Sequence, residues 1–120
     1  MEDSVARLIS RINHFVLERD WNQFHSVKNI VTSISIEAAE LSEIIQWSNP
    51  DVSELMENED LKIKFGEELS DVMIYCLRLF SILGLEPIST INNKISKNEQ
   101  KYPVELSKGR STKYSELRSD

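Results

Sequence analysis

Few residues in this chain are able to interrupt a helix. The sequence of 120 residues holds three glycines and three prolines. Between them, apolar side chains recur every three or four residues, which is the spacing of one helix face. The pattern predicts an all-α chain with main helices at 4–19, 27–47, 59–83 and from Pro87 to just before Tyr102. The remaining segments are expected to be an irregular aromatic patch at 20–25, a charged connection at 51–58 with at most one helical turn, and an extended polar tail at 104–120.

The helix expected at 59–83 is apolar on every side around residues 72–77, the longest uninterrupted apolar run of the sequence. A helix of this kind has to be covered all round. A chain of 120 residues has few other helices for that purpose. We therefore expect a bundle of about four helices that is completed by homo-oligomerisation, with this helix against its copy in a second subunit. A monomeric bundle in which the other helices suffice is the alternative.

Composition excludes several classes of protein. Fourteen basic and 20 acidic side chains give a net charge of −6, which argues against a general binder of nucleic acid or anionic membranes. The run at 72–77 is far shorter than the roughly 20 residues that span a bilayer. Met1-Glu2-Asp3 offers no basic segment of a secretory signal, so we expect a cytoplasmic protein. The single cysteine, Cys76, excludes an intrachain disulfide and a cysteine zinc site.

Two of the expected helices carry carboxylates where apolar side chains are expected. On a helical wheel, Glu37 lies in the middle of the apolar stripe of its helix, and Glu40 lies about 60° to one side. Glu68 and Asp71 repeat this arrangement on the helix at 59–83. Burying a carboxylate costs several kcal/mol unless it is paired or protonated.

A basic partner or a raised pKa is the usual explanation for one acid on an apolar face. Here Lys64 and Arg78 border one stripe, and the other helix has no basic residue after Lys28. Four acids converging between two helices therefore indicate a multivalent cation. Oxygen ligands favour a hard ion, Mg²⁺ before Mn²⁺ or Ca²⁺.

The sequence lacks the residues that several other kinds of catalytic centre require. A di-iron bundle needs a histidine three residues after a glutamate, and neither His14 nor His25 stands there. Zinc hydrolases need histidine or cysteine ligands at suitable spacing, which are missing. The sequence contains no Walker loop, no dinucleotide-binding glycine pattern and no nucleophile elbow.

The acids form a motif that resembles a known family. Glu37-Ala38-Ala39-Glu40 followed by Glu68-Leu69-Ser70-Asp71 is similar to the signature of MazG-like nucleotide pyrophosphohydrolases, members of the all-α NTP pyrophosphatase superfamily. Further segments resemble the dCTP pyrophosphatase branch: 18–25, 40–47, 67–75, 101–103 and 113–117. The resemblance implies a pyrophosphohydrolase domain at 1–103 and a tail at 104–120 that packs near the active site.

Members of this family hydrolyse a nucleoside triphosphate between its α and β phosphates, use Mg²⁺, and assemble as dimers or dimers of dimers. Carried over to this chain, the resemblance makes Glu37, Glu40, Glu68 and Asp71 the metal ligands. Glu40, and then Glu37, are the candidates to orient or deprotonate the attacking water. The substrate expected is dCTP or a modified dCTP, in a role that clears surplus or non-standard nucleotides.

The base of such a substrate requires an aromatic or apolar slot. The candidates are Trp21, Phe24 and Trp47, with His25 as a polar contact. Trp47 is also typical of a subunit interface. Tyr75 is a candidate for the sugar or phosphates, or else a core tyrosine.

One position departs from the resemblance, because Ile12 stands where related dCTP pyrophosphatases carry histidine. Strict selectivity for cytosine is therefore not implied.

The triphosphate also requires cations and amides. Lys94, Asn98 and Lys101 share a helix face, and Asn98 matches a family asparagine. Arg110 and Lys113 belong to the tail, and for all these basic residues an ordinary surface role is equally expected. Two alternatives stay open: a phosphoribosyl-ATP or dUTP-type hydrolase of the same superfamily, or a non-catalytic helical oligomerisation module.

Overall fold

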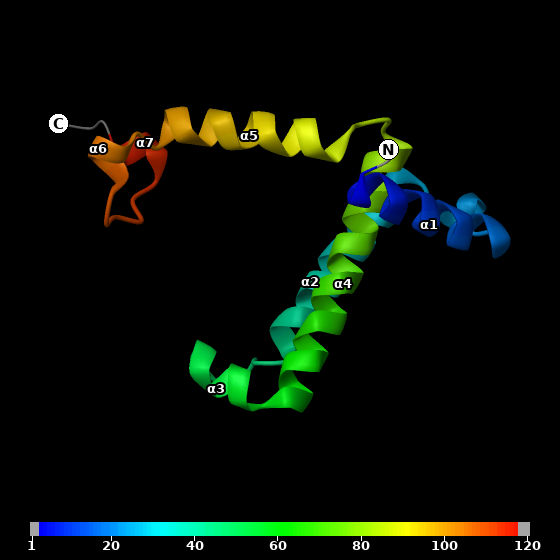
Figure 1. Ribbon diagram of the computed structural model, residues 1–120, viewed down its shortest axis with the longest axis horizontal. Coiled ribbons are helices and arrows are strands. Elements are labelled where there is room, and N and C mark those ends of the chain that lie inside the picture. The colour runs from blue at the N-terminus through cyan, green and yellow to red at the C-terminus, as the bar shows by residue number, and fades with distance from the viewer. Residues whose placement is uncertain (1–2, 118–120) are drawn as a thin grey trace. The chain divides into compact units, whose positions relative to one another are not determined.

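The computed structural model describes residues 3–117, and within them it is helical with no strand. Four helices are long (Figure 1): α1 (Ser4–Glu18), α2 (Val27–Glu43), α4 (Glu59–Ile82) and α5 (Pro87–Lys101). The shorter ones are the 3₁₀ turn η1 (Asn22–Phe24), α3 (Val52–Glu57), α6 (Val104–Ser107) and α7 (Tyr114–Leu117). The all-α prediction is confirmed. The chain divides into two compact units, one ending at Leu85 and one starting at Glu86.

Polar side chains fix where the long helices begin. Asp3 accepts a hydrogen bond from the Ala6 amide at 2.7 Å, and Ser26 and Asn58 cap α2 and α4 in the same way. Gly84 has a φ of 66°, the left-handed conformation that the predicted helix stop requires. These local signals explain why the predicted helix starts agree with the structure.

Three segments differ from the sequence predictions. The second helix ends at Glu43, not at Trp47. After Glu43 the chain forms hydrogen-bonded turns, in one of which the Gln46 amide donates to the Glu43 carbonyl at 3.3 Å. The charged connection contains the six-residue helix α3, which Asp51 caps through the Glu54 amide.

The tail is not extended, because it folds into α6 and α7. There the rings of Tyr102 and Tyr114 lie 6.4 Å apart at 76°. The ammonium of Lys101 lies 5.0 Å from the centroid of the Tyr114 ring, so the tail of the second unit packs on the end of α5.

In the first unit α2 and α4 lie side by side and run antiparallel, and α1 packs against α4 (Figure 1). Val16, Ile30 and Leu77 are buried there, whereas Leu69, Met73 and Ile74 of α4 remain exposed. An apolar cavity of about 460 Å³ is lined by residues of both α1 and α4. The other helices of the single chain thus cover α4 incompletely, as expected for a helix that is apolar on every side in a chain of this size. Oligomerisation itself stays a prediction.

Among the described residues, no single helix has both the length and the apolar composition to cross a bilayer. Taken together, α4 and α5 meet that test by length and composition only.

Candidate metal centre and adjoining cavity

Three carboxylates meet where α2 and α4 pack together. Each of Glu37, Glu40 and Glu68 offers one oxygen, and these oxygens all lie within 4.8 Å of one another. The three-residue spacing of Glu37 and Glu40 puts both on the side of α2 that faces α4. Glu37 and Glu68 are half-buried, and Glu40 is exposed. The sequence predicted that four acids converge between these two helices, and the structure brings three of them together.

The carboxylates of this cluster form no ion pair with a basic side chain among the described residues. The Oε2 atoms of Glu37 and Glu68 are buried and have no hydrogen-bond partner. Within residues 3–117, the two ion pairs that form are His14 with Glu18 and Lys62 with Glu59, and neither involves the cluster. Orphaned carboxylate oxygens in an all-oxygen donor set fit a hard divalent cation.

Burial also changes how these acids titrate. The pKa of Glu37 is raised from 4.5 to about 7, first by burial, then by hydrogen bonding to Glu40 and by the charges of Glu40, Asp71 and Glu68. The pKa of Glu68 is raised as well, by burial and then by the charge of Glu40. Binding a cation would replace the protons that these groups hold.

We expect the metal-free protein to lose stability as the pH rises from about 4.5 to about 7. Folded Glu37 keeps its proton up to a pKa of about 7, whereas its ordinary pKa is 4.5. Over that interval the unfolded chain binds fewer protons than the folded one, so the free energy of unfolding falls with pH. Melting temperatures measured in chelator from pH 4.5 to 8, for wild type and Glu37→Gln, isolate this carboxyl. Parallel curves for the two proteins would contradict the assignment.

Asp71 lies one turn beyond Glu68 and does not belong to the group of three. Its charge raises the pKa of both Glu37 and Glu68, so it adds to the negative field of the cluster. Asp71 also lines a second cavity of about 230 Å³. That cavity is bounded further by Ile12, Phe15, Val16, Trp21, His25, Ile74, Tyr75 and Arg78. The acidic cluster and an aromatic cavity are thus neighbours within the first unit.

The end of α1 positions the aromatic wall of this cavity. Asp20 has a φ of 54°, and the Trp21 amide donates back to the Val16 carbonyl at 3.0 Å, which is a Schellman-type helix end. The reversal brings Trp21 against Phe15, with ring centroids 5.6 Å apart at 77°.

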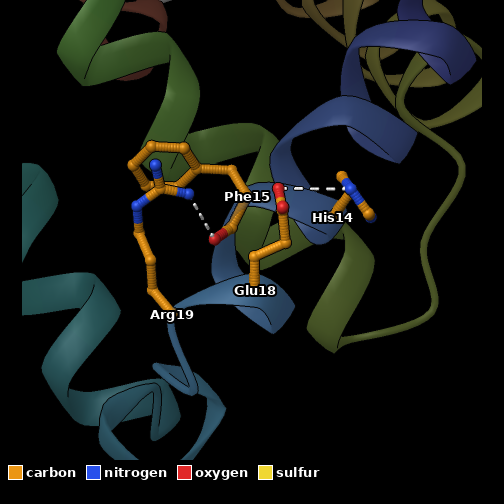
Figure 2. A network of polar contacts seen from close by, with 4 residues as sticks. All are labelled: His14, Phe15, Glu18 and Arg19. Carbon is orange, nitrogen blue, oxygen red and sulfur yellow. Dashed lines mark hydrogen bonds and ion pairs between the residues drawn. The ribbon is translucent and has the colours of Figure 1, made fainter.

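The guanidinium of Arg19 covers the Phe15 ring at 3.8 Å and donates to the Phe15 carbonyl at 3.2 Å (Figure 2). Beside them, His14 pairs with Glu18 at 3.2 Å on the same helix (Figure 2). Cation–π and edge-to-face contacts of this kind hold aromatic rings in place. Phe15 and Trp21 therefore form a supported wall.

Of the other residues predicted to bind the substrate, some line this cavity and others do not. Tyr75 and His25 are half-buried and line the cavity, whereas Phe24 is 59% exposed and does not. Trp47 follows α2 and is 90% exposed. Lys94, Asn98 and Lys113 are exposed in the second unit, so their approach to the acids stays a prediction.

Sequence reasoning missed the role of Arg78, which it considered only as a partner for the acids. The guanidinium instead donates to Asn13, Asn22 and His25 beside the cavity. No spacing rule indicates such a contact, because its members come from α1, η1, the residue after η1, and α4.

Comparisons with known proteins agree with this arrangement. Residues 32–117 match the MazG-like family. The chain is 36% identical over 108 residues to dCTP pyrophosphatase 1 of Rattus norvegicus, and 34% identical over 106 residues to that of Homo sapiens. In both cases the match covers 86% of this chain and 61% of the relative. The chain therefore spans about three-fifths of the length of these curated relatives.

Among solved structures, a pyrophosphatase from Archaeoglobus fulgidus is similar, with a TM-score of 0.77 and 38% sequence identity. That match covers 86% of this chain and 95% of the archaeal one. The chain is thus similar to these proteins in both sequence and structure, and it carries a group of carboxylates between two antiparallel helices. The chain belongs to the MazG-like family.

Proposed function

We propose that this chain is a Mg²⁺-dependent nucleoside triphosphate pyrophosphohydrolase that releases a monophosphate and pyrophosphate, with dCTP or a modified dCTP as substrate. The observation that carries the proposal is the cluster of Glu37, Glu40 and Glu68, which has buried oxygens without hydrogen-bond partners and lies beside an aromatic cavity. The relatives named dCTP pyrophosphatase 1 support the substrate class. We also propose that it acts as a homodimer or homotetramer, because α4 leaves apolar side chains such as Met73 and Ile74 exposed in the single chain.

The acids are proposed to have two roles, metal binding and acceptance of a proton from water. Glu37, Glu40 and Glu68, with Asp71 beside them, would hold the metal ion. A bound Mg²⁺ supplies charge stabilisation for phosphoryl oxygens and positions the leaving pyrophosphate. Glu40 is the exposed member of the cluster, so it is the acid best placed to accept a proton from the attacking water. Glu37 is the second candidate for that role.

The aromatic cavity would receive the base. Trp21 and Tyr75 line it, and His25 offers a polar edge. Trp47 is proposed as a second stacking surface, because a 90% exposed indole has no cover within the described chain. Phe24 is a weaker candidate, and Lys94, Asn98 and Lys113 are proposed to approach the phosphates.

A panel of triphosphates tests the function. Wild-type protein is incubated with Mg²⁺ and dCTP, 5-methyl-dCTP, dUTP, dTTP, dATP or phosphoribosyl-ATP, and the products are separated. We expect a monophosphate and pyrophosphate, fastest from the cytosine nucleotides. Release of inorganic phosphate, or preference for dUTP or phosphoribosyl-ATP, would contradict the proposed chemistry or substrate.

Trp47→Ala is expected to raise KM for the best substrate by about ten- to a hundredfold, since stacking on an aromatic ring is worth about 1–3 kcal/mol per base. The melting temperature should not change, because the side chain is 90% exposed. Steady-state kinetics and thermal melting provide the measurement. Val52→Ala is the control, since Val52 is also apolar and is 75% exposed. A Trp47→Ala protein that dissociates in size-exclusion chromatography and keeps its KM would assign Trp47 to a subunit interface.

A further inference from the structure

Arg78 is a half-buried cation whose described partners are all neutral. Its Nη1 donates to Asn13 Oδ1 at 2.7 Å, its Nη2 to Asn22 Oδ1, and its Nε to His25 Nδ1 at 3.1 Å. Among residues 3–117, no carboxylate forms an ion pair with it. Asn13 is held in turn, because its amide donates to Ser81 Oγ at 2.9 Å. The guanidinium therefore joins α1, η1 and α4 at the wall of the smaller cavity.

The contact with His25 fixes the protonation pattern of that ring. A guanidinium has only donors and stays charged, so Nδ1 of His25 has to accept with its lone pair. The single ring proton of the neutral imidazole then lies on Nε2. Within the described chain Nε2 makes no hydrogen bond, and it is not among the buried orphan atoms. It remains an accessible N–H donor on a residue that lines the cavity.

We infer that Arg78 is a positioning residue, which holds His25 as an N–H donor for an acceptor atom on the edge of the substrate's base. Cytosine offers two such acceptors, the O2 carbonyl oxygen and N3. The inference rests on the proposed function, since it assigns the occupant of the cavity as the base of the triphosphate. It adds a polar contact to a cavity whose other walls are largely apolar or aromatic.

The ring nitrogens of histidine report the arrangement directly. ¹⁵N spectra of the full-length chain at pH 8 should show His25 with an unprotonated Nδ1 and a protonated Nε2. In Arg78→Met, His25 should become a mixture of the two tautomers. His14 is the internal reference, because its Nε2 contacts Glu18 at 3.2 Å on the same helix. Arg7→Met is the matched control, since Arg7 is exposed and contacts Ser4 only weakly, at 3.4 Å.

Kinetics with Mg²⁺ and dCTP test the consequence. Arg78→Met should raise KM about two- to tenfold, because a His25 ring of mixed tautomer offers its Nε2 donor only part of the time and is no longer held in place, with kcat within about twofold. His25→Leu, which has no donor, should raise KM about tenfold, and the double variant should be no worse than His25→Leu alone, because Arg78 acts only through this one contact. Should Arg78→Met not fold, Arg78→Lys is measured instead, since one ammonium cannot serve all three acceptors.

An unchanged His25 spectrum in the Arg78 variant, multiplied effects in the double variant, or a loss confined to kcat would overturn the inference. A wild type that releases no pyrophosphate overturns the proposed function, and the inference falls with it. An active wild type whose Arg78 variant keeps both its tautomer and its KM overturns the inference alone.

Discussion

Glu37→Gln is expected to lower kcat for pyrophosphate release by about a thousandfold, the scale of losing one preorganised charge contact at a reaction centre. The substitution keeps the size of the side chain and removes one metal ligand. It also removes a half-buried carboxylate whose Oε2 has no partner. Because that charge is unfavourable in the metal-free fold, the variant should melt about 2–5 °C higher than wild type in chelator at pH 8. Activity and stability should thus move in opposite directions.

Glu43→Gln is the matched control, because Glu43 is the last residue of α2, is exposed, and lies outside the cluster. It should keep wild-type kinetics and wild-type melting. A Glu37→Gln protein that gains stability and keeps full activity would instead support the non-catalytic helical module, in which the acids are only unfavourably placed core residues.

Removal of divalent ions is expected to abolish activity to the detection limit. The acids of the cluster form no ion pair within the described residues, so a triphosphate would meet their negative charge unless a divalent ion is bound between them. Dialysis against chelator followed by stepwise addition of Mg²⁺ should restore full turnover, and Mn²⁺ should substitute. Initial rates of pyrophosphate release give the measurement.

The same titration has a thermal readout. Mg²⁺ should raise the melting temperature of wild type, because a ligand that binds only the folded state stabilises it. The shift should shrink in Glu68→Gln, which removes a second ligand. Turnover that survives exhaustive chelation would contradict the metal-dependent account.

Much of the first unit could be predicted from sequence, because the decisive signals are local. Apolar periodicity and capping residues such as Ser26 and Asn58 gave the long helices, and the acids stand out because they interrupt an apolar stripe. Glu37 and Glu68 lie close together in the structure, as expected when two apolar stripes that carry the same interruption face each other.

The remainder depends on contacts that a linear pattern does not contain. The turns before Trp47 keep the side-chain spacing of a helix for a few residues after α2 has ended. The helix predicted from that spacing is therefore too long at its C-terminal end. Helices as short as α6 show no period at all. Asp20 adopts a left-handed backbone conformation, but it is not a glycine, the residue type by which such positions are usually recognised in a sequence. Arg78 has its partners 53 to 65 residues away along the chain.

The most direct measurement is an anomalous difference map from crystals soaked in Mn²⁺, which occupies magnesium sites and scatters anomalously. The account predicts a peak bonded to oxygens of Glu37, Glu40 and Glu68, and loss of that peak in Glu37→Gln crystals. Wild-type crystals with no peak there, and with these side chains turned into bulk solvent, would contradict it.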